Sequence, residues 1–367
     1  MFFALDKNNR RLFFKHPLLG SFLYIIMSLM LLQSCKKDDD KKLSEPNFTP
    51  QFLYAGYSYG SNDFKTNNRR AIVIVNDSII KLSPNIRAEA QAVYGKGKDV
   101  FVAGCRLYGA ENRRIVSWKN GSIRHLSDAQ AYNNATAIYE DQGKVYVAGT
   151  SYETLLNRVG PFQSLWVDGE RRVRQGMLDF SSINAITTYK GNYFLAGKFA
   201  QAASIWHNNT TRTIRKAASN AAYIHATEAD TIVLGYGPKN SSVDELIVWK
   251  NSKIIFSYPL QERIQHVFAY MEGKDYYFVT TSATKAGNFN AKVYKNRTLL
   301  YQLAPDKICK PVGIQVFQGN VYVLSNILDK GRSTPTLWKN GKAQTLYSAD
   351  KNIYLNHFYI SEIETGA

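Results

Sequence analysis

The chain of 367 residues is 45% hydrophobic and 13% aromatic, and its formal net charge is +17. This composition is too apolar and too aromatic for a disordered chain, and the length suits one large domain or two of ordinary size. The 24 tyrosines and 19 phenylalanines, among many valines and isoleucines, favour β structure.

The first 34 residues have the pattern of a secretory signal. Basic residues within positions 1–17 precede an apolar run from Leu18 to Leu32, which is shorter than the roughly 20 residues that a spanning helix needs. The run ends in Leu32-Gln33-Ser34-Cys35, which resembles a bacterial lipobox. The resemblance implies that Cys35 is lipidated and becomes the first residue of the mature chain. An ordinary signal peptide and an uncleaved anchor are the alternatives.

A charged segment, Lys36-Lys37-Asp38-Asp39-Asp40-Lys41-Lys42, follows the predicted lipid site. It resembles the acidic export signal after the lipid cysteine of Bacteroidota lipoproteins. That resemblance implies a protein held in the outer membrane by Cys35 and facing the exterior. Residues 35–50 are therefore predicted to be the lipidated cysteine and a flexible tether. Removal of residues 1–34 lowers the net charge only from +17 to +14, so the mature chain stays strongly basic.

Three motifs recur seven times each in the rest of the chain. The first is an apolar segment that ends in a small residue, as in Val145-Tyr-Val-Ala-Gly149, and it occupies 52–56, 100–104, 145–149, 193–197, 231–235, 276–280 and 321–325. The second is a strand end followed by a turn, as in Trp118-Lys-Asn-Gly121, and it occupies 74–77, 118–121, 166–169, 206–209, 249–252, 294–297 and 338–341. The third precedes the first in each unit, at 90–94, 135–139, 183–187, 221–225, 264–268 and 313–317, with a last copy at 355–359.

The second motif advances 264 residues in six steps, a mean of 44. Asn-Gly and Asp-Gly pairs between apolar runs predict two-residue hairpins, and a fourth short strand follows each hairpin. Four strands in this length correspond to one propeller blade, so we expect an all-β, seven-bladed β-propeller over residues 51–361 and a C-terminal tail over 362–367. A β-solenoid is the alternative.

The chain enters the repeat at a second strand and leaves it after a first strand. The N- and C-terminal strands are therefore expected to pair in one shared blade and to close the ring. The repeat lacks the Gly-His and Trp-Asp pairs of WD40 repeats and the Gly-Gly doublets of kelch repeats. It resembles the Val-Tyr-Val-Ala-Gly…Trp-Lys-Asn-Gly propeller repeats of Bacteroidota lipoproteins, a resemblance that implies no particular activity.

The connections between second and third strands are predicted to be long loops that gather on one face of the ring. They carry twelve basic and six acidic residues together with several aromatic ones. Arginine matches the geometry of carboxylate and sulfate groups, so this face is predicted to bind an anionic polymer. The candidate residues are Arg69, Arg70, Arg106, Tyr108, Arg113, Arg114, Tyr152 and Arg158. A solvated rim on a basic protein is the alternative.

The sequence favours a binding protein over an enzyme. Ser58 lies in a G-x-S-x-G match, but no helix is expected after it, as a nucleophile elbow requires. His225, His266 and His357 fall on innermost strands without neighbouring carboxylates, and no Cys/His spacing suits a metal. We therefore predict no catalytic residue, no metal and no cofactor. Whether Cys105 and Cys309 are paired is left open.

Three functions follow from these patterns. The first is a lipid-anchored binding module for an anionic glycan or a partner protein at the cell surface. A carbohydrate-active enzyme, either a lyase or a hydrolase, and a purely structural envelope component are the alternatives. We expect a monomer that attaches to the membrane through Cys35 and has no nucleic-acid partner.

Overall fold

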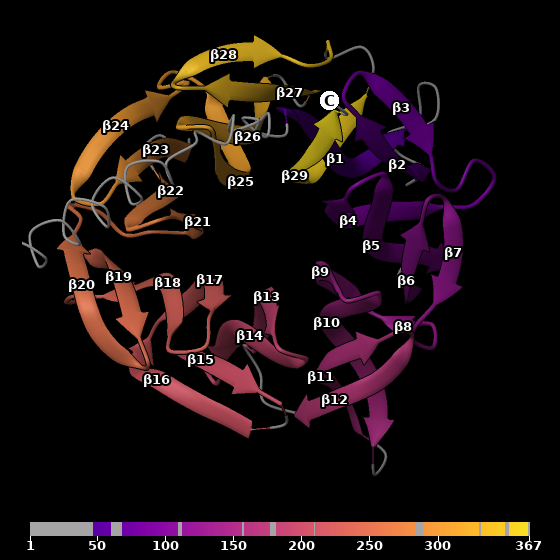
Figure 1. Ribbon diagram of the computed structural model, residues 1–367, viewed down its shortest axis with the longest axis horizontal. Helices are drawn as coiled ribbons and strands as arrows, with labels where there is room; N and C mark the ends of the chain where they lie inside the picture. Colours follow the sequence, from indigo (N-terminus) through magenta and orange to yellow (C-terminus); the bar gives the residue numbers. More distant parts are fainter. Residues whose placement is uncertain are drawn as a thin grey trace, which may run out of the picture. The chain divides into compact units, whose positions relative to one another are not determined.

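Seven antiparallel sheets, six of four strands and one of five, form a ring around a central axis (Figure 1). The computed structural model describes residues 47–59, 68–108, 112–155, 158–176, 181–208, 210–283, 289–329, 332–348 and 352–365. The predicted signal peptide, Cys35 and most of the tether lie outside these residues. Within them there are strands and turns but no helix, and no helix is long and apolar enough to cross a membrane. The predicted seven-bladed β-propeller is therefore confirmed.

The blades are numbered in chain order, and the strands of each blade are given from the axis outward. Blade 1 contains β29 (Ile353–Thr365), β1 (Asn47–Tyr59), β2 (Arg69–Val75) and β3 (Ser78–Lys81). Blade 2 contains β4 (Ala88–Lys96), β5 (Asp99–Tyr108), β6 (Asn112–Lys119) and β7 (Ser122–His125), with β8 (Gln130–Ala131) paired to β6. Blade 3 contains β9 (Asn134–Asp141), β10 (Lys144–Leu155), β11 (Arg158–Val167) and β12 (Glu170–Gly176).

The remaining four blades follow the same order. Blade 4 contains β13 (Ser182–Tyr189), β14 (Asn192–Phe199), β15 (Ala202–His207) and β16 (Thr210–Ala218). Blade 5 contains β17 (Asn220–Ala226), β18 (Thr231–Pro238), β19 (Asp244–Lys250) and β20 (Lys253–Pro259). Blade 6 contains β21 (His266–Glu272), β22 (Asp275–Ala283), β23 (Phe289–Lys295) and β24 (Thr298–Leu303). Blade 7 contains β25 (Ile308–Phe317), β26 (Asn320–Asp329), β27 (Arg332–Lys339) and β28 (Lys342–Thr345).

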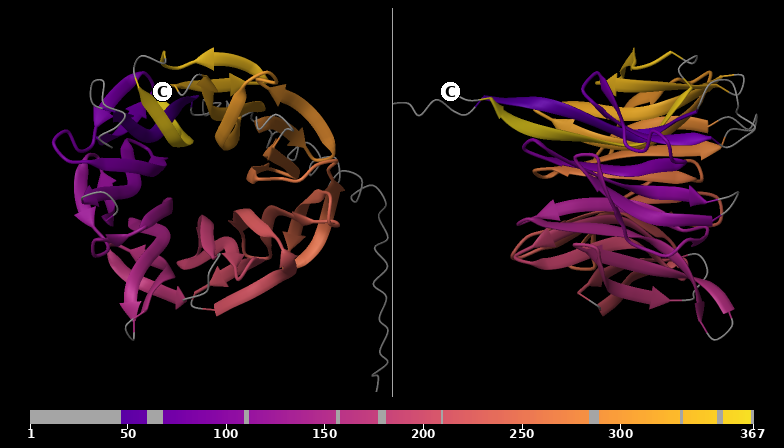
Figure 2. Two further views of the ribbon diagram at one scale, coloured as in Figure 1. Left: turned by 180° about the vertical axis from the view of Figure 1, so that it is seen from behind. Right: turned by 90° about the vertical axis from the view of Figure 1, so that its right-hand side faces the viewer.

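Blade 1 closes the ring by combining the two ends of the described chain, as predicted. The last strand, β29, is the innermost strand of the blade and pairs with the first strand, β1. Figure 2 shows these two strands, yellow and indigo, side by side. They also run past the expected propeller limits at residues 51 and 361, since β1 begins at Asn47 and β29 ends at Thr365.

The same hydrogen-bond geometry joins two of the repeated motifs in every blade. The third residue of the strand-end motif has a φ between 46° and 53° and lies in the turn. Its side-chain oxygen accepts a hydrogen bond, 2.8–3.4 Å long, from the backbone N–H of the first residue of the apolar motif. These third residues are Asn76, Asn120, Asp168, Asn208, Asn251, Asn296 and Asn340. Asn and Asp are suited to this position because they tolerate the left-handed region and carry an acceptor oxygen.

The glycine of the apolar motif marks a close approach of two backbones. A Cβ at Gly104 would lie 2.0 Å from the carbonyl oxygen of Glu89, where β4 carries a bulge between Ala90 and Ala92. Blade 6 has Thr280 at this position, and its β21–β22 register is regular. Blade 7 keeps a bulge beside the small Ser325. The residue at the end of the motif is therefore coupled to the shape of the innermost strand.

Seven hydrophobic clusters hold the ring together, one between each pair of neighbouring blades. Trp118, Trp166, Trp206 and Trp249 are at most 2% exposed, and each packs against the preceding blade. Cys105 and Cys309 are buried in two of these clusters and are not disulfide-bonded, which answers the question that the sequence left open.

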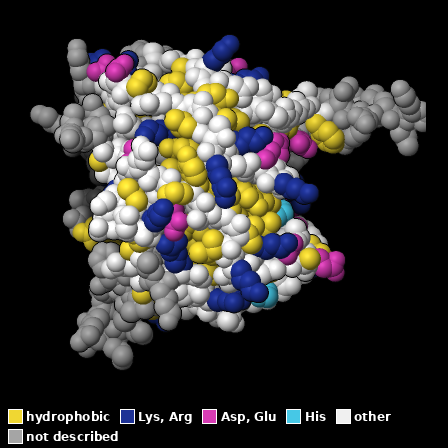
Figure 3. All heavy atoms as spheres, turned by 90° about the vertical axis from the view of Figure 1, so that its left-hand side faces the viewer, with side chains coloured by type: hydrophobic (Ala, Val, Ile, Leu, Met, Phe, Trp, Pro, Cys, Tyr) yellow, Lys and Arg dark blue, Asp and Glu magenta, His cyan; other side chains and the backbone are white. Residues whose placement is uncertain are grey.

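The outer edges of blades 5 and 6 expose hydrophobic side chains among Lys and Arg (Figure 3). Ile254, Ile255 and Leu299 are 48–53% exposed on β20 and β24, the outermost strands of these blades. Lys253 begins β20, and the Arg297 guanidinium lies 5.5 Å from the ring centroid of Phe256. Charged residues at such positions oppose pairing of an edge strand with another chain.

Candidate functional site

Where the structure describes them, the predicted long loops between second and third strands are mostly strand. β5 continues to Tyr108 and β6 begins at Asn112, while β10 continues to Leu155 and β11 begins at Arg158. Extending a hairpin satisfies the backbone N–H and C=O groups that a loop would have to satisfy otherwise. The candidate arginines of blade 2 therefore lie on paired strands near the rim, and the expectation that they occupy loops is wrong.

A buried carboxylate joins two of the predicted arginines. Glu89 of β4 is 5% exposed and forms ion pairs with Arg69 of β2 and with Arg113 of β6, the latter at 3.6 Å between Nη1 and Oε2. The Arg69 guanidinium also lies 4.9 Å from the ring centroid of Tyr57. The two arginines offset the cost of burying the carboxylate, and the three groups together carry a net charge of +1. Glu89 was not among the residues predicted from the sequence for this site.

Two further arginines share one aromatic ring. Arg106 and Arg114 face each other across β5 and β6, and their guanidinium carbons lie 4.9 and 5.5 Å from the ring centroid of Tyr108. The ring faces offset part of the repulsion between the two cations. The Arg114 Nε is buried and has no hydrogen-bond partner among the described residues. Burial and these two arginines hold the pKa of His125 below its ordinary value.

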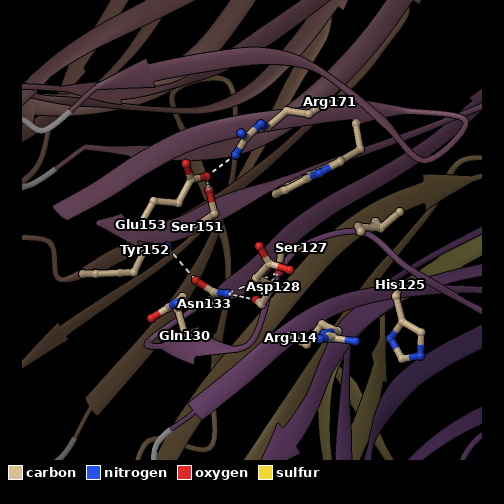
Figure 4. A pocket seen from close by; sticks show the side chains of 12 residues that line it. Arg114, His125, Ser127, Asp128, Gln130, Asn133, Ser151, Tyr152, Glu153 and Arg171 are labelled. Carbon is tan, nitrogen blue, oxygen red and sulfur yellow. Dashed lines mark hydrogen bonds and ion pairs between the residues drawn. The ribbon is translucent and has the colours of Figure 1, made fainter. Parts of the chain in front are cut away.

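A cleft of about 680 Å³ opens between blades 2 and 3 beside these residues (Figure 4). Its wall includes Arg114 and His125 from blade 2 and Tyr152, Glu153 and Arg171 from blade 3. Figure 4 shows Arg114 and His125 beside one another, and the ion pair of Glu153 and Arg171 elsewhere on the wall. The volume lies within the range of small-molecule and oligomer-binding pockets, about 300–1,000 Å³.

Asn133 fixes the floor of the cleft. Its Nδ2 donates to the carbonyl oxygens of Arg113 and Asp128, at 2.9 and 2.8 Å, and its Oδ1 accepts from the backbone N–H of Tyr152 at 2.6 Å. The side chain is buried and bridges the two blades. The segment between β7 and β9 is thereby held in place before any ligand binds. No sequence signal marked Asn133, since two of its partners are the backbone groups of Arg113 and Tyr152, 20 and 19 residues away.

Blade 3 repeats the arrangement seen at Glu89. Glu153 forms ion pairs with Arg171 and with Arg174, the latter at 2.9 Å, and accepts a hydrogen bond from Ser151 at 3.1 Å. Arg174 also lies 4.2 Å from the ring centroid of Phe162. Arg171 and Arg174 were not among the predicted residues because they belong to the fourth strand of the blade, β12, and not to the predicted loops.

The arginine cluster, as we name it, spans blades 1 to 3. It consists of Arg69, Arg106, Arg113, Arg114, Arg171 and Arg174. Among the described residues, the carboxylates that pair with these arginines or line the cleft are those of Glu89, Glu153 and Asp128. The region therefore keeps an excess of three positive charges, with several guanidinium groups fixed by rings or carboxylates.

Of the other predicted residues that the structure describes, only Tyr152 lines the cleft. Its ring packs against Tyr132 at 5.7 Å between centroids. The side chain of Arg70 makes no hydrogen bond or ion pair to another residue that the structure describes, and its backbone pairs in register with Ser58 of β1. Arg158 begins β11, and its side chain lies outside what is described. Ser58 thus sits inside a regular strand pair, so it does not occupy the strand-to-helix turn of a nucleophile elbow.

The three inner-strand histidines do not form a cluster for metal binding. His225 and His357 line a separate cavity on the axis, whereas His266 is not among its lining residues. No group of three or more His, Cys, Asp or Glu side chains among the described residues is placed to hold a metal ion. His357 instead accepts a hydrogen bond at Nδ1 from the backbone N–H of Val93 at 3.4 Å.

Comparison with known proteins shows the fold and not a family. No protein-family model matches the sequence, and no curated protein does. Among solved structures, the acylaminoacyl peptidase of Pyrococcus horikoshii is similar with 13% identity and a TM-score of 0.52, over 83% of this chain and 52% of that one. The β-propeller domain of the Trilobed protease from Pyrococcus furiosus, which has an open velcro topology, is similar with 10% identity and a TM-score of 0.50, over 84% and 97% of the two chains.

The chain spans about half the length of the acylaminoacyl peptidase that it matches. At these identities the likeness concerns the β-propeller architecture alone, because one architecture supports many unrelated functions.

Proposed function

We propose that this protein is a non-enzymatic binding module that holds an anionic polysaccharide at the cell surface, anchored in the outer membrane by lipid on Cys35. The arginine cluster and the adjoining cleft are the binding site. The anchor and location rest on the lipobox-like segment and on the charged run after it.

The observation that carries this proposal is the way the carboxylates are shared. Glu89 and Glu153 each contact two arginines, and Arg106 and Arg114 share a tyrosine ring. Guanidinium groups that are already oriented lose less rotational freedom when they bind a carboxylate or a sulfate. The excess positive charge attracts an anionic chain, and binding should weaken as salt screens it.

The same geometry argues against the carbohydrate-active enzyme. A glycosidase needs one carboxylic acid that can give up a proton and a second carboxylate that is available to act on the sugar or on water. Glu89 and Glu153 are each engaged by two arginines, which occupy the carboxylate oxygens. We therefore expect incubation with acidic polysaccharides to yield no shortened or unsaturated products.

The test measures binding to immobilised polygalacturonate, dextran sulfate and neutral dextran. We expect the two anionic polymers to be retained and neutral dextran to pass. The double variant Arg114→Ser/Arg171→Ser should weaken retention about tenfold or more, as expected when charge-assisted hydrogen bonds are lost. Retention should also decline as salt is raised.

The matched control is Arg172→Ser/Arg212→Ser, which removes the same charge from exposed positions outside the cleft. We expect it to weaken retention by about twofold or less, through the general field alone. Equal losses in the two double variants would show that net charge, and not this site, binds the polymer. Capture of a protein partner with no retention of either anionic polymer would overturn the proposed ligand class.

A further inference from the structure

A second cavity lies on the axis of the ring, apart from the arginine cluster. Its volume is about 400 Å³, and residues from the innermost strands of all seven blades line it. This volume again falls in the range of small-molecule sites. The closure of blade 1 completes the wall, because β29 supplies Asn356, His357 and Tyr359.

The axial cavity is lined without a single Asp, Glu, Lys or Arg among the described residues. Charged residues make up 20% of the whole chain, and the cleft between blades 2 and 3 carries several of them. A charged ligand inside the axial cavity would lose its hydration without gaining an opposite charge, which is unfavourable. An uncharged ligand avoids this penalty, so the two cavities suit opposite classes of molecule.

Polar groups are nevertheless available on the cavity wall. His357 accepts at Nδ1 from Val93, so its neutral ring carries the proton on Nε2 as a donor. Burial lowers the pKa of His357 to about 4 and also lowers that of His225, which keeps both rings neutral at pH 7. The imidazole of His225 makes no hydrogen bond to another described residue, whereas its backbone pairs with Ile232.

An amide on the wall is held with its oxygen uncommitted. The Nδ2 of Asn184 donates to the Oδ1 of Asn220 at 2.7 Å and to the carbonyl oxygen of Ala221 at 2.8 Å. Both N–H groups of Asn184 are thus engaged by blade 5, and no donor to its Oδ1 is recorded in the described part of the chain. The wall therefore offers a fixed acceptor as well as imidazole donors.

Aromatic rings form a further part of the wall. The ring centroid of Tyr94 lies 4.8 Å from that of Tyr139 and 4.7 Å from that of Tyr359, and Tyr223 lies 5.7 Å from Tyr270. Burial raises the pKa of Tyr359 to about 12, so its hydroxyl stays protonated and can donate. Aromatic faces with hydroxyl edges suit a ligand that has both C–H faces and hydroxyl groups.

We infer that the axial cavity is a second binding site that takes a small uncharged polyhydroxylated ligand, of the size of a neutral monosaccharide. His225, His357 and the Asn184 oxygen make hydrogen bonds to its hydroxyl groups. The tyrosine rings pack against its C–H faces. This site is independent of the arginine cluster.

The experiment titrates the full mature chain with D-glucose, D-galactose, D-mannose and D-xylose by calorimetry and by saturation-transfer NMR. We expect saturable binding of at least one of these sugars. D-glucuronate and D-glucosamine, which add a charge to a similar ring, should bind about tenfold more weakly or worse. Failure of all four neutral sugars, or equal binding of neutral and charged ones, would overturn the inference.

Two variants place the ligand in the cavity. His225→Leu removes hydrogen-bonding groups from the wall and should weaken sugar binding about tenfold, whereas His207→Leu, on an exposed end of β15, should leave it unchanged. Ala185→Phe fills the cavity from β13 and should abolish binding. Thermal unfolding and polygalacturonate retention report whether each variant is folded. Unchanged sugar binding in a folded His225→Leu protein would refute the assignment, even if Ala185→Phe fails to fold.

Discussion

The shared carboxylate of Glu89 gives the sharpest test of the arginine cluster. Glu89→Gln preserves the volume of the side chain and one acceptor oxygen but removes the charge that Arg69 and Arg113 contact. A charge-assisted hydrogen bond contributes about 1.5–3 kcal/mol, and breaking a buried ion pair costs about 3–5 kcal/mol. Because glutamine retains part of the interaction, we expect a loss of about 2 kcal/mol in the free energy of unfolding.

The same substitution should strengthen binding of an anionic polymer. It adds one unit of positive charge, and a unit charge at about 8 Å in water contributes about 0.5 kcal/mol, so the affinity for polygalacturonate should rise about two- to threefold at low salt. Stability and affinity are thus predicted to change in opposite directions, which a general unfolding effect would not produce.

Urea unfolding followed by tryptophan fluorescence measures the first effect, and polygalacturonate retention measures the second. Glu170→Gln is the control, because Glu170 and Arg172 form an ion pair with 71% and 58% exposed side chains and such pairs contribute less than about 1 kcal/mol. If Glu89→Gln were no more destabilising than Glu170→Gln, the buried ion pairs would not stabilise the fold as argued. A decrease in polymer affinity in the folded variant would contradict the charge argument.

Three further predictions concern the repeat, a histidine and the thiols. Gly104→Ala should destabilise the fold by about 3 kcal/mol or more, because the added Cβ would lie 2.0 Å from a carbonyl oxygen. The control Gly143→Ala, which has open space around it and a φ of +81°, should cost about 1 kcal/mol, and equal losses in urea unfolding would reject the close approach. The pKa of His357 is lowered from 6.5 to about 4, so the unfolded chain binds more protons than the folded chain between these pH values, and stability should fall by about 2–3 kcal/mol as the pH drops from 6.5 to 4. An unaltered pH slope in His357→Asn would assign the effect to another group. Burial raises the pKa of the Cys105 and Cys309 thiols to about 12 and about 11, so mass spectrometry should find both unmodified by iodoacetamide in the folded protein and both modified in denaturant.

The architecture was predictable because its signals are local and repeated. Asn120-Gly121 specifies a tight hairpin through the φ values that these residues tolerate, and the same pair recurs in related form in every blade. The incomplete first and last repeats then required β1 and β29 to share a blade. The sequence also indicated that basic and aromatic residues gather near one face of the ring, because the strand pattern predicts where the second strand of each blade ends and the third begins.

The candidate site depended on contacts that the sequence does not encode locally. Whether Arg106 and Arg114 lie on a loop or a strand is decided by pairing of β5 with β6, and their shared contact with Tyr108 follows from that register. Glu89 meets Arg69 only because blades 1 and 2 are neighbours in the ring. Arg171 lies outside the predicted loops, and only the pairing of β12 with β11, which stands between β12 and β10, brings it to Glu153 of β10.

The axial cavity shows the same division between what the sequence predicts and what only the tertiary structure decides. Periodicity alone placed His225 and His357 on innermost strands, since side chains alternate along a strand and the motif recurs in register. Their surroundings, free of charged side chains and completed by β29, exist only when seven blades close around one axis. The sequence by itself therefore determined the number of blades, their strand order and the closure of the ring, because hairpins and repeats are short-range features. Tertiary structure alone decided which charges are paired and which polar groups line the axial cavity, because both depend on residues from different blades.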